Sequence, residues 1–139
     1  MCLHTKMKTP RIAKRKIYVY KMLLKKGDKY YAPIINVNHS IEYEYRKGVN
    51  YPLGEKKFIS ITTDKKYEAM IEDGWLHGYK TNSKSTVDTL CTNWNWAFFD
   101  HTDCNNYFIV VKMYIPKGAE YYVSDDNKQV CSSCLVWED

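Results

Sequence analysis

The chain has 139 residues, of which 45% are hydrophobic and 27% are charged, and its net charge at pH 7 is +5. This length and balance indicate one globular domain and exclude a disordered or collagen-like chain. The sequence contains neither an apolar run of the ~20 residues that a membrane span needs nor the apolar segment of a secretory signal peptide. We therefore expect a protein that is not secreted and does not bind a membrane.

The first part of the chain predicts a basic arm followed by antiparallel strands. Every charged residue in 1–26 is basic, and residues 1–15 form the expected arm. Alternation in "KIYVYKMLL" predicts a strand, Gly27 and Asp28 suit a turn, and Pro33 limits the return strand to an edge. The strands expected here cover 16–24, 30–35 and 40–48, the last one half-exposed and ended by Gly48.

The middle of the chain predicts two helices. In 64–74, Asp64 suits an N-cap, apolar residues share one face, and Gly74 suits a stop. In 82–100, Val87, Leu90, Cys91 and Trp94 recur at helical spacing. Short extended segments are expected at 57–63 and 75–81.

The end of the chain predicts a strand-rich region. The near-continuous apolar run at 106–116 indicates a central strand buried on both faces. A turn at 116–118 and strands at 119–124 and 129–137 follow. The fold class that we predict is α+β, a mostly antiparallel twisted sheet with one or two helices packed on it, in a single domain over 1–139.

The last strand contains two cysteines, Cys131 and Cys134, whose spacing has two interpretations. One is a zinc site in which Cys131 and Cys134 join Cys2 and His4 and hold the two ends of the chain together. Apart from this candidate zinc ion, we expect no cofactor. The other is a pair of small buried residues, because residues three apart on a strand point to opposite faces. We expect the second. Five cysteines, an odd number, favour a reducing compartment over a disulfide framework.

Interleaved basic and aromatic residues near the start suggest a contact surface. Tyrosine contributes contact area at low entropic cost, and lysine steers encounter with anionic partners. Tyr18 and Tyr20 share one strand face, and we expect that face to pack in the core. The candidate binding residues are Lys14, Arg15, Lys16, Tyr30, Tyr31, Tyr43 and Tyr45.

Several segments resemble a group of small uncharacterised proteins of phages and prophages. The matching pieces are the "MCLHTK" start, "GWLHGYKT" in mid-chain and the "YIPKGAEYY" hairpin. The resemblance implies an accessory protein of a mobile element that acts in the host cytoplasm or in a virion. Its expected partner is a host or virion protein, with nucleic acid as a second class.

A more distant likeness is to the ADP-ribosyltransferase fold, carried by "IYVYK", "FISIT" and "YIPKGAEYY". That likeness implies a protein that binds or acts on a nucleotide such as NAD or ADP-ribose, with His77, Lys21 and Ser60 as candidate catalytic residues. The last strand lacks the glutamate that stabilises the charge developing on the ribose. We therefore expect a non-enzymatic binding module. The alternatives are a protein that binds or acts on a nucleotide and a structural module stabilised by zinc.

Overall fold

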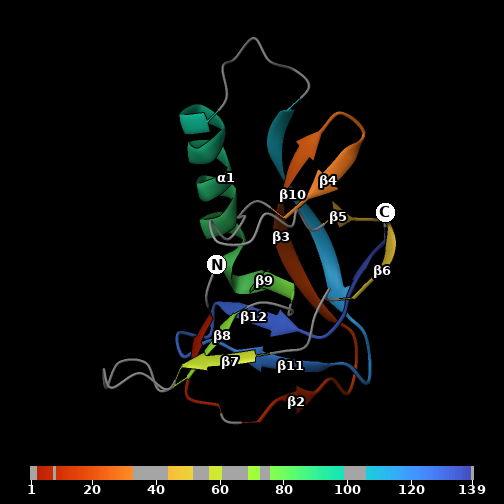
Figure 1. Cartoon of the computed structure of the whole chain (residues 1–139), viewed down its shortest axis with the longest axis vertical. Helices are drawn as coiled ribbons and strands as arrows, with labels where there is room; N and C mark the ends of the chain where they lie inside the picture. Colours follow the sequence, from red (N-terminus) through yellow and green to blue (C-terminus); the bar gives the residue numbers. More distant parts are fainter. Residues whose placement is uncertain are drawn as a thin grey trace.

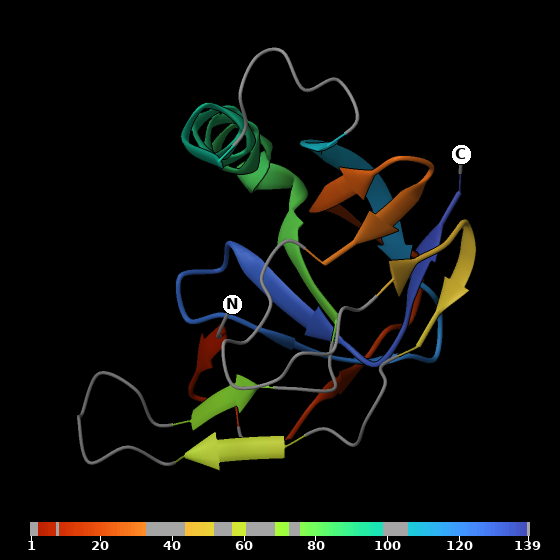
Figure 2. The same cartoon turned by 45° about the horizontal axis from the view of Figure 1, so that its top comes forward.

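A computed structural model describes residues 3–7, 9–32, 44–51, 57–60, 69–72, 76–98 and 106–138 (Figure 1). These residues form a ten-stranded sheet, a separate three-stranded sheet and one long helix. The three-stranded sheet contains β1 (Leu3–Thr5), β8 (Ala69–Glu72) and β7 (Lys57–Ser60), and Figure 2 shows β7 and β8 at the border of the molecule. The larger sheet contains β2 (Arg11–Ile12), β3 (Ile17–Lys26), β4 (Lys29–Tyr31), β5 (Glu44–Tyr45), β6 (Gly48–Asn50), β9 (Leu76–Lys80), β10 (Asn106–Ile115), β11 (Glu120–Val123), β12 (Gln129–Ser132) and β13 (Leu135–Trp137).

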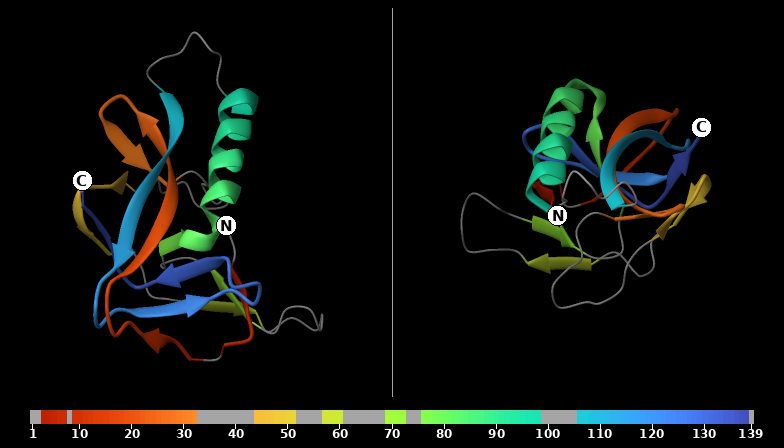
Figure 3. Two further views of the ribbon diagram at one scale, coloured as in Figure 1. Left: turned by 180° about the vertical axis from the view of Figure 1, so that it is seen from behind. Right: turned by 90° about the horizontal axis from the view of Figure 1, so that it is seen from above.

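The large sheet curls because β12 and β13, which are continuous in the chain, pair with two different strands, β9 and β10. Its strand order is β2-β11-β12-β9-β3-β10-β13-β6, with β4 and β5 added beside β3. β12 and β13 follow each other directly, yet β12 pairs with β9 and β13 pairs with β10. The path from β9 through β3 to β10 is therefore bent round a core, and Figure 3 shows β3 and β10 crossing the β11–β12 layer.

The inner face of the central pair β3–β10 contributes Val19, Leu23, Met113 and Ile115 to that core. β3 and β10 are paired over their whole length, from Ile17 opposite Ile115 to Lys26 opposite Asn106. Val19 and Leu23 on β3 are fully buried with Met113 on β10. This confirms the strands predicted at 16–24 and 106–116 and the mostly antiparallel α+β fold, since all strand pairs in the described residues are antiparallel.

The helix α1 (Lys84–Phe98) covers part of the outer face, as Figure 1 shows. Val87 and Cys91 pack against Met22 and Phe108 of the central strands. The Phe108 amide donates to the Asn95 Oδ1 at 2.6 Å, and the Asn95 amide donates back to the Phe108 carbonyl at 3.0 Å. Asn95 thus satisfies the backbone of β10 where the helix lies against it.

We expect Asn95→Ala to lower the free energy of unfolding by about 2 kcal/mol, because it leaves two backbone groups of a buried residue without these partners. Asn93→Ala changes an exposed asparagine of the same helix and is expected to alter stability by less than about 0.5 kcal/mol. Urea denaturation followed by tryptophan fluorescence measures both. Equal losses of stability in the two variants would show that the Asn95–Phe108 hydrogen bonds make no specific contribution.

The helix predicted at 64–74 is wrong where the structure describes it. Residues 69–72 form β8, whose Ile71 lies opposite both Leu3 of β1 and Phe58 of β7. Strand pairing on both sides satisfies the backbone of this segment, and this tertiary gain overrides a weak helical pattern. Residues 61–68 and 73–75 lie outside the described residues.

Three other predicted segments differ in detail. The expected arm contains β1 and β2, and Thr5 and Ala13 within it are buried, so it belongs to the sheets. The expected strand at 40–48 includes only β5 among the described residues, and Gly48, with φ of 100°, begins β6. The expected strand at 129–137 is interrupted at 133–134, where the chain leaves β9 and joins β10.

Candidate functional site

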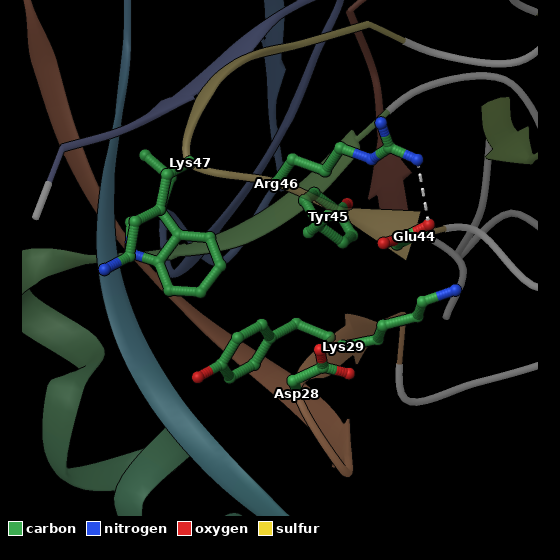
Figure 4. A pocket seen from close by; sticks show the side chains of 8 residues that line it. Asp28, Lys29, Glu44, Tyr45, Arg46 and Lys47 are labelled. Atoms are coloured by element: carbon green, nitrogen blue, oxygen red, sulfur yellow. Dashed lines mark hydrogen bonds and ion pairs between the residues drawn. The ribbon is translucent and has the colours of Figure 1, made fainter.

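A surface hollow of about 370 Å³ lies where β4 and β5 meet β13 (Figure 4). Tyr30 and Tyr45 lie directly opposite each other on β4 and β5 and both line it. Trp137 is a buried indole that contacts Tyr30 edge to face, with ring centroids 4.9 Å apart. The remaining lining residues are charged: Asp28, Lys29, Glu44, Arg46 and Lys47.

The charged lining surrounds the aromatic part with three cations and two carboxylates. Figure 4 shows Asp28 and Lys29 on one side of the hollow and Arg46 and Lys47 on the other. Arg46 pairs with Glu44 at 3.2 Å, and its guanidinium side chain is largely exposed. The Lys47 ammonium lies 6.0 Å from the centroid of the Trp137 indole.

Asn50 fixes the segment that carries these cations. Its Oδ1 accepts from the Arg46 amide at 2.9 Å, and its Nδ2 donates to the Arg46 carbonyl at 2.8 Å. A rigid backbone with exposed basic tips over aromatic rings suits an acidic or aromatic side chain of a partner.

The hollow brings together only part of the predicted binding set. Tyr30 and Tyr45 line the hollow, whereas Tyr31 does not. The Lys26 ammonium lies 5.6 Å from the centroid of the Tyr31 ring. Tyr43 lies outside the described residues. The basic residues Lys14, Arg15 and Lys16 are exposed between β2 and β3 and are not part of the lining.

Lys21, a candidate catalytic residue, is buried behind the hollow with 8% of its surface exposed. Its ammonium lies 5.2 Å from the ring centroid of Tyr45. Burial lowers the pKa of Lys21 from 10.5 to about 8, and the thiol of Cys131 acts in the opposite direction. At neutral pH the amine therefore stays mostly protonated inside the fold.

His77, the second catalytic candidate, lies opposite Cys131 in the pairing of β9 with β12. Burial, and to a smaller extent the Lys21 ammonium, lower the pKa of His77 from 6.5 to about 3. Its Nε2 is 3.8 Å from the Cys131 Sγ, while its Nδ1 is buried without a hydrogen-bond partner. An unsatisfied buried nitrogen of this kind costs about 1–3 kcal/mol.

A buried amine, a buried thiol and a partly buried imidazole thus form a cluster that does not suit nucleophilic catalysis. Burial raises the pKa of Cys131, which is completely inaccessible, so its sulfur stays protonated and unreactive. Ser60, the third candidate, lies in β7 of the other sheet, opposite Met70. No local pattern predicts the His77–Cys131 contact, because it arises from the register of two strands far apart in the chain.

The two cysteines are buried as predicted, but they do not share one strand, because Cys131 lies in β12 and Cys134 lies in the break before β13. Cys131 and Cys134 are both free and buried, and burial also raises the pKa of Cys134. Within the described residues, no group of three or more His, Cys, Asp or Glu side chains is placed to hold a metal ion. Cys2 lies outside that part of the chain, and the His4 side chain is not described, so the four-ligand zinc site stays a prediction.

Comparison with known proteins yields no relative for this chain. No family model, no curated protein and no solved structure matches it. In the portion of the chain that the structure describes, no helix has the length and apolar character needed to cross a membrane.

Proposed function

We propose that this protein is a non-enzymatic binding module, an accessory protein of a phage or mobile element that holds a host or virion protein. The observation that supports binding is the hollow, in which Tyr30, Tyr45 and Trp137 lie below exposed basic side chains. The resemblance of the "MCLHTK" and "YIPKGAEYY" segments supports the phage origin.

The hollow is suited to a protein partner for two reasons. Its half-buried Tyr30 provides contact area that loses little side-chain entropy on binding, and it is supported by the buried rings of Tyr45 and Trp137. Its cations outnumber its carboxylates by three to two, so it attracts an acidic side chain and speeds encounter.

Capture from a bacterial host lysate by immobilised protein tests this function. We expect one polypeptide, identified by mass spectrometry, whose recovery falls about tenfold when Lys29→Ala and Arg46→Ala are combined. The matched control combines Lys117→Ala and Lys128→Ala, which remove equal charge from exposed positions away from the hollow. The control is expected to recover the partner as the original protein does.

Equal recovery by the two double variants would contradict a role of the hollow. A rise in melting temperature with NAD or ADP-ribose that the hollow variant lacks would instead favour the nucleotide alternative. Both results can be obtained before the partner is identified.

A further inference from the structure

A row of apolar and aromatic side chains, exposed at its two ends, crosses four strands on the outer face of the sheet, away from the hollow. Strand register places Tyr18 opposite Tyr114, Tyr114 opposite Val136, and Val136 opposite Val49. Directly opposed residues of antiparallel strands point to the same face, so these four form one line, here named the tyrosine row. Trp137, next to Val136, points the other way and lines the hollow.

The row is accessible at both ends. Tyr18 is 42% exposed and Val49 is 55% exposed, although both belong to paired strands. The sequence pattern assigned Tyr18 to the core, and this was wrong, because α1 covers the neighbouring Tyr20 and Met22 instead. Between these ends Tyr114 is half-buried and Val136 is buried, so the accessible part of the row lies around Tyr18 and Val49.

Lysines are fixed over the tyrosines of the row. Lys16 lies over Tyr114 and Lys112 over Tyr18, each with its ammonium 4.5 Å from the ring centroid. The two rings contact each other edge to face, with centroids 5.9 Å apart. The row thus presents the positive charges of two lysines directly over its tyrosine rings.

A carboxylate of the chain itself occupies the donors at one end of this surface. The Tyr114 hydroxyl donates to a Glu138 oxygen at 3.3 Å, and the Lys16 ammonium lies 3.7 Å from the same oxygen. Glu138 is exposed and follows β13 directly, so it reaches the row from the end of the described chain. The same donors are suited to a carboxylate that a partner supplies.

We propose that the tyrosine row is a docking surface for an acidic polypeptide segment and that Glu138 competes with that segment for Lys16 and Tyr114. Single-stranded nucleic acid is less suited, because lysine already covers one face of each ring and bases need open faces to stack. A second copy of this chain is less suited too, since its net charge of +5 opposes self-association through a cationic row.

Poly-L-glutamate is the probe that tests this proposal, with binding measured by fluorescence anisotropy and located by amide chemical shifts in NMR spectra. We expect the shifts to centre on β3 and β10 around Tyr18 and Tyr114. Removing the competitor with Glu138→Gln is expected to tighten binding about threefold. Combining Lys16→Ala with Lys112→Ala is expected to weaken it about tenfold.

The matched control is Lys117→Ala combined with Lys128→Ala, which lowers the net charge equally and is expected to weaken binding by less than about twofold. Equal losses in the two double variants would mean that poly-L-glutamate senses only net charge, which overturns the proposal. Weaker or unchanged binding after Glu138→Gln overturns it as well, as does displacement of the probe by oligothymidylate from the same amides. The row and the hollow are separate surfaces, so either proposal can fail without the other.

Discussion

Acidification from pH 7 to pH 4 is expected to lower the free energy of unfolding by about 3 kcal/mol through His77 alone. The pKa of His77 is about 3 in the fold and 6.5 as its ordinary value. Between these values the unfolded chain binds a proton at this residue and the folded chain does not. Stability due to His77 is therefore fully present above pH 6.5 and is lost as pH falls toward 3.

His77→Asn separates this contribution from that of carboxylates, which also titrate in this range. The variant is expected to lose about 3 kcal/mol less than the original protein between pH 7 and pH 4, by urea denaturation at each pH. Cys91→Ala is the matched control, since it removes a buried side chain of α1 and is expected to lower stability similarly at every pH. An unchanged acid sensitivity in His77→Asn would show that the imbalance in proton binding lies elsewhere.

Replacing the buried lysine, Lys21→Met, is expected to raise the free energy of unfolding at pH 7 by up to about 3 kcal/mol. The pKa of Lys21 is about 8 in the fold against 10.5 as its ordinary value, mainly because burial disfavours its charge. Methionine has a similar shape without the charge, and it keeps the contact with the Tyr45 ring.

The pH dependence of stability gives a second test of the same lysine. In the original protein the unfolded chain holds the Lys21 proton above pH 8 while the fold releases it, so stability should rise by about 1 kcal/mol from pH 8 to pH 9. Above pH 9 the Cys131 thiol, whose pKa burial raises, contributes the opposite slope. The rise is therefore to be measured below pH 9.

Lys21→Met is expected to lack that rise, and Lys112→Met, an exposed lysine of the same sheet, is expected to keep it. Guanidinium denaturation at pH 7, 8 and 9 measures all three proteins. A Lys21→Met protein that is less stable than the original at pH 7 would contradict a net cost of burying this charge.

The sequence predicted those parts of the fold whose pattern is strong within a single segment. Period-two alternation identified β3, a continuous apolar run identified β10, and helical spacing from Val87 to Trp94 identified α1. Segment 69–72 was assigned wrongly because its strand depends on β1 and β7, which lie far from it in the chain. The break between β12 and β13 has the same origin, since it is where the strand changes partner.

The sequence indicated some residues of the candidate site but not those that strand pairing brings to it. Tyrosine content pointed to Tyr30 and Tyr45, because half-buried tyrosines are typical of contact surfaces, but only Tyr30 is half-buried and Tyr45 packs in the core. Trp137 and Arg46 join them only through the pairing of β4 with β5 and the return of β13, which no local pattern encodes. The tyrosine row was missed because one strand face carries both Tyr20, under the helix, and Tyr18, beyond it.

The protein is proposed to act by binding through its exterior and not through a buried reactive centre. The most direct test compares partner recovery by the hollow variant, Lys29→Ala with Arg46→Ala, and by the interior variants His77→Asn and Lys21→Met. We predict about a tenfold loss of recovery for the hollow variant and full recovery for both interior variants. Loss of the partner in the interior variants, with full recovery by the hollow variant, would contradict the account.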